Sequence, residues 1–183
     1  MTKNLTVDEL ISGIPSLKAG ERILLSGVIH TARDAAHQRL AELDVAGKPL
    51  PIDLKNAFIY YCGPCPARPG YPIGSCGPTT SSRMDRFTPM MLGFGVKATI
   101  GKGPRSPEVR DACVKYGALY LAATGGVAAL LARTVRKSSV VAFEDLGPEA
   151  IHRLEVVDFP LIVAIDAQGN DIFNRNEVNG VKR

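Results

Sequence analysis

Proline and glycine dominate one stretch of this 183-residue chain, and that stretch limits what the chain can fold into. Nine of the 16 residues between Gly63 and Pro78 are proline or glycine. Proline cannot donate a backbone hydrogen bond and glycine weakens regular structure, so no helix or regular strand is expected there. An irregular segment of this length in a compact domain is usually functional.

Strands and helices are predicted to alternate on both sides of this stretch. Apolar and β-branched runs predict strands at Glu21–His30, Ala57–Tyr61, Val96–Ile100, Ala118–Ala122 and Val140–Phe143. Helices are predicted at Thr6–Ser12, Thr31–Leu43, Thr80–Leu92 and Gly126–Arg136, and another begins at Ser106-Pro107-Glu108. The tail from Leu154 to Ile172 is again β-rich, with a turn at 167–170. The alternation predicts an α/β fold, with a mixed sheet and flanking helices, as a single domain over residues 1–183.

Composition excludes several classes of function. The net charge of +4 is too small and too dispersed to indicate nucleic-acid binding, although it allows a local basic pocket for an anion. No apolar run of about 18 residues indicates a membrane span. The polar start, MTKNLTVDELISG, does not resemble a signal peptide, so we expect a cytoplasmic protein whose four cysteines are reduced.

The segment from Gly77 to Asp85 (GPTTSSRMD) is the first candidate site. Pro78 suits a first helical position, and the free amides of a helix start bind anions. Arg83 follows Thr79 by one helical turn, so a carboxylate could reach both side chains. The alternative is ordinary helix capping, since Ser82 and Asp85 fit a capping box.

Two further segments carry cations. In Gly101-Lys102-Gly103-Pro104-Arg105, Lys102 follows a predicted strand between two glycines, where ligands often bind in α/β folds. The alternative is a solvated loop lysine, and the spacing does not match a phosphate-binding loop.

Arg33 and His37 are four residues apart at a predicted helix start, where a bound anion would offset the unfavourable position of Arg33. The alternative is an exposed helix start at which Arg33 pairs with an acidic side chain.

The cysteines give weaker signals. Cys62-Gly63-Pro64-Cys65 has the spacing of a dithiol redox site, but the prolines that follow prevent the helix on which such a site depends. No second Cys-x-x-Cys or histidine pair completes a zinc site, so we expect no metal site in this chain. The remaining candidates, which are cations and hydroxyls, could surround a small anion but supply only half of an active site.

These segments resemble the β component of the class I fumarase and L(+)-tartrate dehydratase family. The resemblance covers nearly the whole chain and rests on segments in the family's order, namely Thr31–His37, Ile59–Pro64, Gly77–Asp85, Ile100–Gly103, Phe159–Val163 and Asp166–Asn170. It implies a swivelling β/β/α fold. It also implies a separate α subunit, in a heterodimer or heterotetramer, that carries a [4Fe–4S] cluster.

The resemblance also assigns roles. Thr79 would be the catalytic base, and Arg33, Arg83 and Lys102 would bind the dicarboxylate, with Gly77, Pro78, Thr80 and His37 in support. Hydration of fumarate needs a proton-transfer group at one carbon, an electrophile for the oxygen at the other, and cations for the carboxylates. This chain could supply the first and the last. Tyr60-Tyr61, the proline-rich loop and Met84-Asp85 resemble the fumarase branch of the family more closely, which implies fumarate and malate as substrates in preference to tartrate. Other hypotheses are a free-standing dithiol oxidoreductase and a module that binds a dicarboxylate without catalysis.

Overall fold

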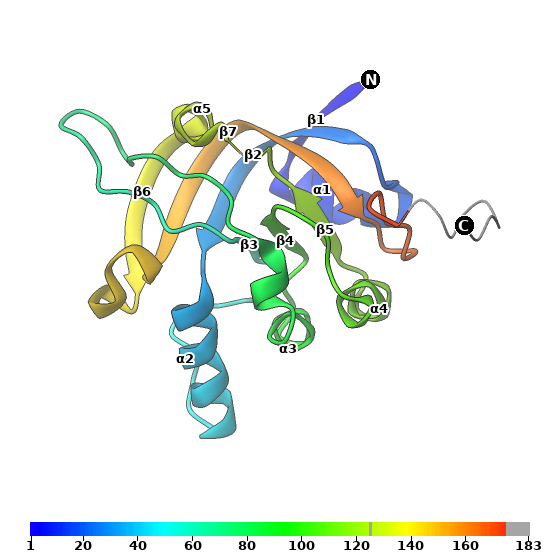
Figure 1. Ribbon diagram of the computed structural model, residues 1–183, viewed down its shortest axis with the longest axis horizontal. Helices are drawn as coiled ribbons and strands as arrows, with labels where there is room; N and C mark the ends of the chain where they lie inside the picture. The colour runs from blue at the N-terminus through cyan, green and yellow to red at the C-terminus, as the bar shows by residue number, and fades with distance from the viewer. Residues whose placement is uncertain (125, 175–183) are drawn as a thin grey trace.

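The computed structural model describes residues 1–124 and 126–174, which form a mixed α/β structure with helices on both sides of a curved sheet (Figure 1). Five parallel strands lie side by side, and β7 runs antiparallel to β2, β5 and β6. The strands are β1 (Thr2–Thr6), β2 (Arg22–Thr31), β3 (Phe58–Tyr60), β4 (Ala98–Gly101), β5 (Leu119–Ala122), β6 (Val135–Ala142) and β7 (Ile151–Ile165). The α-helices are α1 (Val7–Gly13), α2 (Asp34–Val45), α3 (Thr88–Gly93), α4 (Pro107–Tyr116) and α5 (Ala128–Thr134).

The long strand β7 closes the sheet on itself. One edge of β7 pairs with β2, and the other edge pairs first with β6 and then with β5. Strands β2, β3, β4, β5 and β7 therefore form a ring, with β1 beside β2 and β6 beside β7. The β2–β7 register shifts between Leu25 and Gly27, and such a bulge increases the local bend of a strand.

Two apolar cores lie on opposite faces of this sheet. Phe58 and Tyr60 of β3 point into the first core, which α1 and α5 complete. Ile59 and Tyr61 point into the second, which lies on the side of the sheet that α2, α3 and α4 cover (Figure 1). Successive side chains of a strand alternate between faces, and both faces are buried here, so the strands read as continuous apolar runs.

Most of the predicted elements are present. The predicted strands before and after the irregular stretch correspond to β2, β3, β4 and β5, and α1, α2 and α4 also appear. The α2 helix begins later than predicted because Thr31 belongs to β2. Helix α5 is shorter than the predicted 126–136, because residues 135 and 136 belong to β6. Strand β6 therefore begins earlier than the predicted Val140–Phe143. The tail forms one 15-residue strand, followed by a turn at Gly169. None of the helices in the described residues is long and apolar enough to cross a membrane.

The predicted helix from Thr80 to Leu92 is wrong. Thr80 is extended, a 3-10 turn covers Ser81–Met84, and α3 begins only at Thr88. Pro89 stands in the first turn of α3, where proline fits, but it cannot donate back to a preceding helical turn. The predicted capping box also fails, because the Asp85 carboxylate bonds to Arg105 and to the Ser106 amide.

Candidate functional site

The candidate residues gather at the carboxyl ends of three neighbouring parallel strands, hereafter the site edge. Strand β2 ends just before Arg33, β3 ends at Tyr60, and β4 ends just before Lys102. Because β2, β3 and β4 are adjacent and parallel, these ends lie at one edge of the sheet.

Thr79 is held against the end of β3. Its amide donates to the Tyr61 carbonyl oxygen at 2.8 Å, and its hydroxyl donates to the same oxygen at 2.9 Å. Its side chain is partly exposed. Since the hydroxyl donates its proton to a carbonyl, both oxygen lone pairs remain available to a ligand.

Backbone pairing brings Lys102 to the same place. The Lys102 amide donates to the Thr79 carbonyl oxygen at 3.3 Å, and the Ser81 amide donates to the Lys102 carbonyl oxygen at 3.0 Å. Thr80 and Lys102 thus form an isolated parallel bridge, and both side chains are exposed. The two sequence motifs therefore lie side by side, with Thr79 next to the loop that carries Lys102.

Gly77 and Pro78 lead the chain into this position. A Cβ atom at Gly77 would lie 2.8 Å from Cβ of Ala128, the first residue of α5, so only glycine fits without displacing that helix. Pro78 is buried but opens no helix, because the chain stays extended through Thr80. The predicted anion site at a helix start formed by Pro78 is therefore absent from this segment.

Arg33 is paired with an acidic side chain. Its Nη2 atom lies 3.0 Å from Oε1 of Glu149, and both side chains are mostly buried. The other Glu149 oxygen accepts from the Ala35 amide at 2.8 Å, so Glu149 caps the first turn of α2, which Arg33 cannot do. The buried Arg33 Nε atom has no hydrogen-bond partner among the described residues.

Arg83 is also held by a carboxylate. Its Nε atom donates to Oδ1 of Asp34 at 3.1 Å, and its Nη2 atom lies 2.9 Å from Oδ2. Asp34 directly follows Arg33, so this ion pair brings Arg83 to the start of α2. The alternative expectation was an exposed helix start at which Arg33 pairs with an acidic side chain. The pairing is confirmed and the exposure is wrong, since the Arg33 side chain is mostly buried, and Arg83 is paired in the same way.

His37 lies beneath this pair of cations and not in the open site. Its side chain is fully buried between Tyr61 and Phe87, with ring centroids 5.5 and 5.7 Å away. Nδ1 lies 2.8 Å from the Arg33 carbonyl oxygen, which fixes the neutral tautomer with its proton on Nδ1. Burial lowers the pKa of His37 to about 4. A neutral histidine here orders the start of α2 and adds no charge to the site.

The cysteines do not form a reactive pair. Cys62 is buried and Cys65 is exposed. A hydrogen bond with Cys76 and burial raise the pKa of Cys62, whereas a dithiol redox site requires a lowered pKa. No group of three histidine, cysteine, aspartate or glutamate side chains in the described part of the chain could hold a metal ion.

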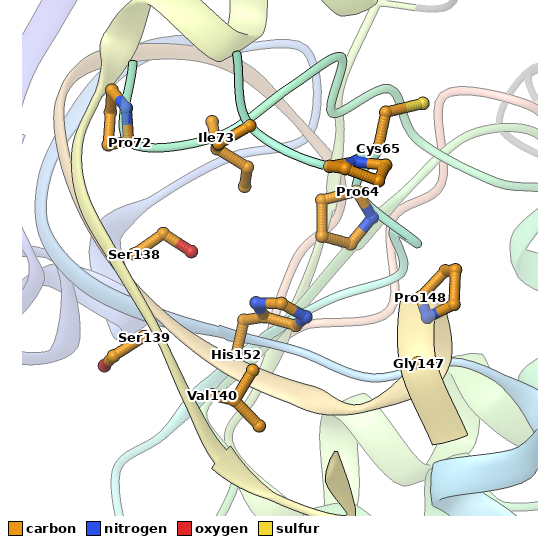
Figure 2. Close-up of a pocket in the computed structure, with 12 residues that line it drawn as sticks. Pro64, Cys65, Pro72, Ile73, Ser138, Ser139, Val140, Gly147, Pro148 and His152 are labelled. Carbon is orange, nitrogen blue, oxygen red and sulfur yellow. The ribbon is translucent and has the colours of Figure 1, made fainter. Parts of the chain in front are cut away.

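A hollow of about 340 Å³ is lined by none of the candidate residues Arg33, Thr79, Arg83 and Lys102 (Figure 2). Pro64, Cys65, Pro72 and Ile73 line one side of it, and Ser138, Val140 and His152 face them from β6 and β7. Since no arginine or lysine is among the described residues that line this hollow, they offer a dicarboxylate no opposite charge.

Sequence reasoning did not identify Glu149, Asp34 or the Asp85–Arg105 pair as parts of the site. Glu149 is 116 residues from Arg33, and no local pattern links them. Asp34 and Arg105 lie inside the motif segments, but their ion-pair partners, Arg83 and Asp85, come from another segment that only the fold brings close.

Comparison with known proteins gives one family. Residues 2–176 match the family described as "Fumarase C-terminus". The chain is 41% identical over 174 residues to "Fumarate hydratase class I, anaerobic" of Escherichia coli, covering 94% of this chain and 32% of that protein. It is 41% identical over 172 residues to "Putative L(+)-tartrate dehydratase subunit beta" of Methanocaldococcus jannaschii, covering 91% of this chain and 87% of that protein. It is 36% identical over 182 residues to "L(+)-tartrate dehydratase subunit beta" of Escherichia coli, covering 97% and 89%.

These relatives differ in size relative to this chain. The chain spans about a third of the length of the fumarate hydratases that it matches. It spans nearly all of the tartrate dehydratase β subunits.

Proposed function

Because this chain belongs to the Fumarase C-terminus family, we propose that it is the β subunit of a two-subunit hydro-lyase that interconverts fumarate and L-malate. The observation that carries the proposal is the convergence of Arg33, Thr79, Arg83 and Lys102 at the site edge. The swivelling β/β/α description of the domain is part of the same proposal.

The cations suit a substrate with two carboxylates. Arg33 and Arg83 stand at the start of α2, each paired with a carboxylate, and Lys102 stands beyond Thr79. In this proposal the three cations bind the two carboxylates of a small dianion. Glu149 and Asp34 hold the two arginines in place before substrate arrives.

Thr79 would carry the proton. In dehydration, the Thr79 oxygen, deprotonated, removes the proton from a substrate carbon, and the electron pair of that C–H bond forms the C=C bond as hydroxide leaves. In hydration, the Thr79 hydroxyl returns its proton to that carbon. A threonine hydroxyl gives up its proton with difficulty, so the proposal requires the cations, Lys102 beside the Thr79 segment and Arg83 at the start of α2, to favour the deprotonated form.

The electrophile for the hydroxide would come from a partner. A [4Fe–4S] cluster is the group that the family resemblance implies, and the described residues of this chain do not fit one. Three of the four cysteines are buried and they form no three-ligand group. We therefore place the cluster on an α subunit. The larger size of the fumarate hydratases supports this division, since about two thirds of their length lies outside the match.

L(+)-tartrate is the second candidate substrate. The relatives of nearly the same length as this chain are named as tartrate dehydratase β subunits, which supports a two-chain tartrate enzyme. Tyr60, Tyr61 and Met84, which favoured fumarate in the sequence, are buried and so do not line the open site. The ratio of kcat/KM for malate and for tartrate decides between the two, and a higher value for tartrate would reverse our choice.

Replacement of Thr79 by alanine tests the proposed proton transfer. Thr79→Ala in the assembled enzyme is expected to lower kcat by about 10²- to 10⁴-fold, as loss of a general acid–base group does. Ser82→Ala, which removes an exposed hydroxyl three residues later, is the matched control and should leave kcat unchanged. Malate turnover is followed by fumarate absorbance, with assembly checked by size-exclusion chromatography. Near-normal turnover of an assembled Thr79→Ala enzyme would rule out the role of Thr79.

A further inference from the structure

Arg105 is a charged loop residue whose side chain is completely buried. It directly follows the Gly101–Pro104 turn that carries Lys102, and its side chain has an exposed fraction of 0%. Burial of a charge is unfavourable unless the charge is paired and hydrogen-bonded. The surroundings of Arg105 therefore have to supply both.

The Arg105 guanidinium uses several of its donors. Nε donates to Oδ1 of Asp85 at 2.6 Å, Nη2 donates to Oγ1 of Thr88 at 2.6 Å, and Nη1 donates to Oγ1 of Thr99 at 3.3 Å. The rings of Tyr61 and Tyr120 lie 5.3 and 4.8 Å from its central carbon. The planar guanidinium is thus bonded in three directions, which a lysine ammonium does not reproduce.

Asp85 completes the link between the two motif segments. Its second oxygen accepts from the Ser106 amide at 2.8 Å, so one carboxylate binds both the Arg105 side chain and the backbone that follows it. Asp85 ends the segment that contains Thr79 and Arg83, and Arg105 ends the segment that contains Lys102. The buried ion pair therefore joins the two segments in addition to the backbone bridge between Thr80 and Lys102.

Tyr120 of β5 makes a further link between the same segments. Its hydroxyl donates to the Gly103 carbonyl oxygen at 2.8 Å and lies 3.0 Å from Oγ of Ser81. Ser81 is fully buried and packs against Gly101, where a Cβ atom would collide with its hydroxyl. The spacing between the Thr79 segment and the Lys102 loop is thus set by buried polar contacts.

We propose that Arg105, through Asp85, is a positioning residue that fixes Lys102 relative to Thr79 and Arg83. Its side chain is buried away from the open site, so its effect on turnover passes through the residues it holds. Misplacement of a reacting group by about 1 Å costs about 10²-fold in rate, so a small shift of the Lys102 loop is enough to be measured. The effect of Arg105 on turnover rests on the proposed function, whereas its effect on the geometry of the two segments does not.

Hydrogen exchange of the chain by itself tests the geometric part. The Ser81 and Lys102 amides bond across the two segments, and the Thr79 amide bonds to Tyr61 beside them. The Ile23 and Leu25 region, in contrast, belongs to the distant half of β2. In Arg105→Lys and in Asp85→Asn, exchange is expected to become about tenfold faster at the first three amides, as loss of a charged hydrogen bond predicts. Exchange at Ile23 and Leu25 should stay unchanged.

Tyr120→Phe is the mild companion variant, because it removes one hydroxyl and keeps the ring. It should accelerate exchange at Ser81 and less at Thr79, and it keeps the test valid if Arg105→Lys does not fold. Uniform acceleration along the chain in all folded variants would overturn the inference, since it would show that Arg105 stabilises the fold in general.

Turnover in the assembled enzyme tests the functional part. Arg105→Lys is expected to lower kcat by about 10²-fold, with a much smaller change in the KM for malate. Because Arg105 and Asp85 act as one unit, the double variant should be no slower than the slower single variant. The positioning role would be overturned if Arg105→Lys lowered assembly as much as turnover. It would also be overturned if the losses in kcat of the two single variants added fully in the double variant. If the wild-type assembly has no malate turnover, the proposed function fails, and the exchange result still decides the geometric part.

Discussion

Two irregular segments that follow each other in the chain are held in different ways. Every residue from 65 to 72, hereafter the arm, is exposed, and the arm is joined at its base by backbone bonds between Cys65, Gly74 and Ser75. The next segment, from Cys76 to Ser81, has both of its end residues fully buried. It bonds to Ala128, Tyr61 and Lys102, three residues that lie in three different parts of the sequence.

The difference shows what proline and glycine can predict. Both segments contain these residues, and both lack regular structure, as the sequence indicates. Only the second is packed, because its amides and hydroxyls find partners at the ends of β3 and β4. The density of proline and glycine predicts an irregular backbone, whereas long-range polar contacts decide which part of it is rigid.

The largest expected difference between the two regions is in the pH dependence of stability. His37 lies under the site edge, and its folded-state pKa of about 4 is below the unfolded value. As pH falls, His37 therefore takes up a proton in the unfolded chain before it does so in the folded chain. This lowers the free energy of unfolding by up to about 3 kcal/mol between about pH 6.5 and pH 4. In urea unfolding across this range, the free energy of unfolding should fall less with pH in His37→Asn than in the wild-type chain.

His152, which lies beside the arm, is the matched control. Burial also lowers its pKa, but the residue is only half-buried, so His152→Asn should change the pH dependence less. An equal effect at the two positions would contradict the contrast between a packed site edge and an open arm.

Glycine-to-alanine changes should lower stability and turnover more at the packed site edge than in the exposed arm. A Cβ atom at Gly101 would collide with the Ser81 hydroxyl and lie 2.9 Å from a ring carbon of Tyr61. Gly101→Ala is expected to lower the free energy of unfolding by about 1–3 kcal/mol and to reduce turnover, because Lys102 follows directly. Thermal or urea unfolding and malate turnover measure the two effects.

Gly70 in the arm gives the comparison for that change. It has a φ of +81°, and a Cβ atom added there would meet no other atom within 4 Å, so only backbone strain opposes alanine. Gly70→Ala should cost about 1 kcal/mol and leave turnover unchanged. A larger cost at Gly70 than at Gly101 would mean that the arm is packed against something in solution.

The smallest expected effect concerns the thiols. Cys65 in the arm is exposed, and Cys62, Cys76 and Cys113 are buried. A maleimide reagent should therefore modify Cys65 rapidly in the folded chain and the other thiols only after unfolding, as mass spectrometry would show. Cys65→Ser should abolish the rapid reaction and change stability by no more than about 0.5 kcal/mol. Rapid labelling of Cys62 would show that the site edge opens as easily as the arm.

Local patterns predicted the parts of the fold that are locally determined. Strands β2, β3, β4 and β5 are buried apolar runs, and α4 begins at the Ser106-Pro107 signal. Strand β1 was missed because TKNLT is polar and mostly exposed, and it is a strand only through its pairing with β2. The 80–92 helix was wrong because contacts to distant strands outweighed a helical pattern.

The site shows the same division. The motifs pointed to Arg33, Thr79 and Lys102, which lie near the ends of β2, β3 and β4, and to Arg83, which reaches the start of α2 through Asp34. Their catalytic and binding roles stay predictions. The acidic side chains that hold the arginines were not predictable, because Glu149 and Asp34 are assigned by the fold and not by sequence spacing.

The central claim is that the site edge is half of an active site and works only with a partner that supplies the electrophile. The most direct measurement is anaerobic malate-to-fumarate turnover, followed by fumarate absorbance, of this chain alone and mixed with a candidate α subunit loaded with its cluster. Turnover in the mixture and none with either component alone is the predicted result. Turnover by this chain alone, or none in a mixture whose cluster is intact, would contradict the claim.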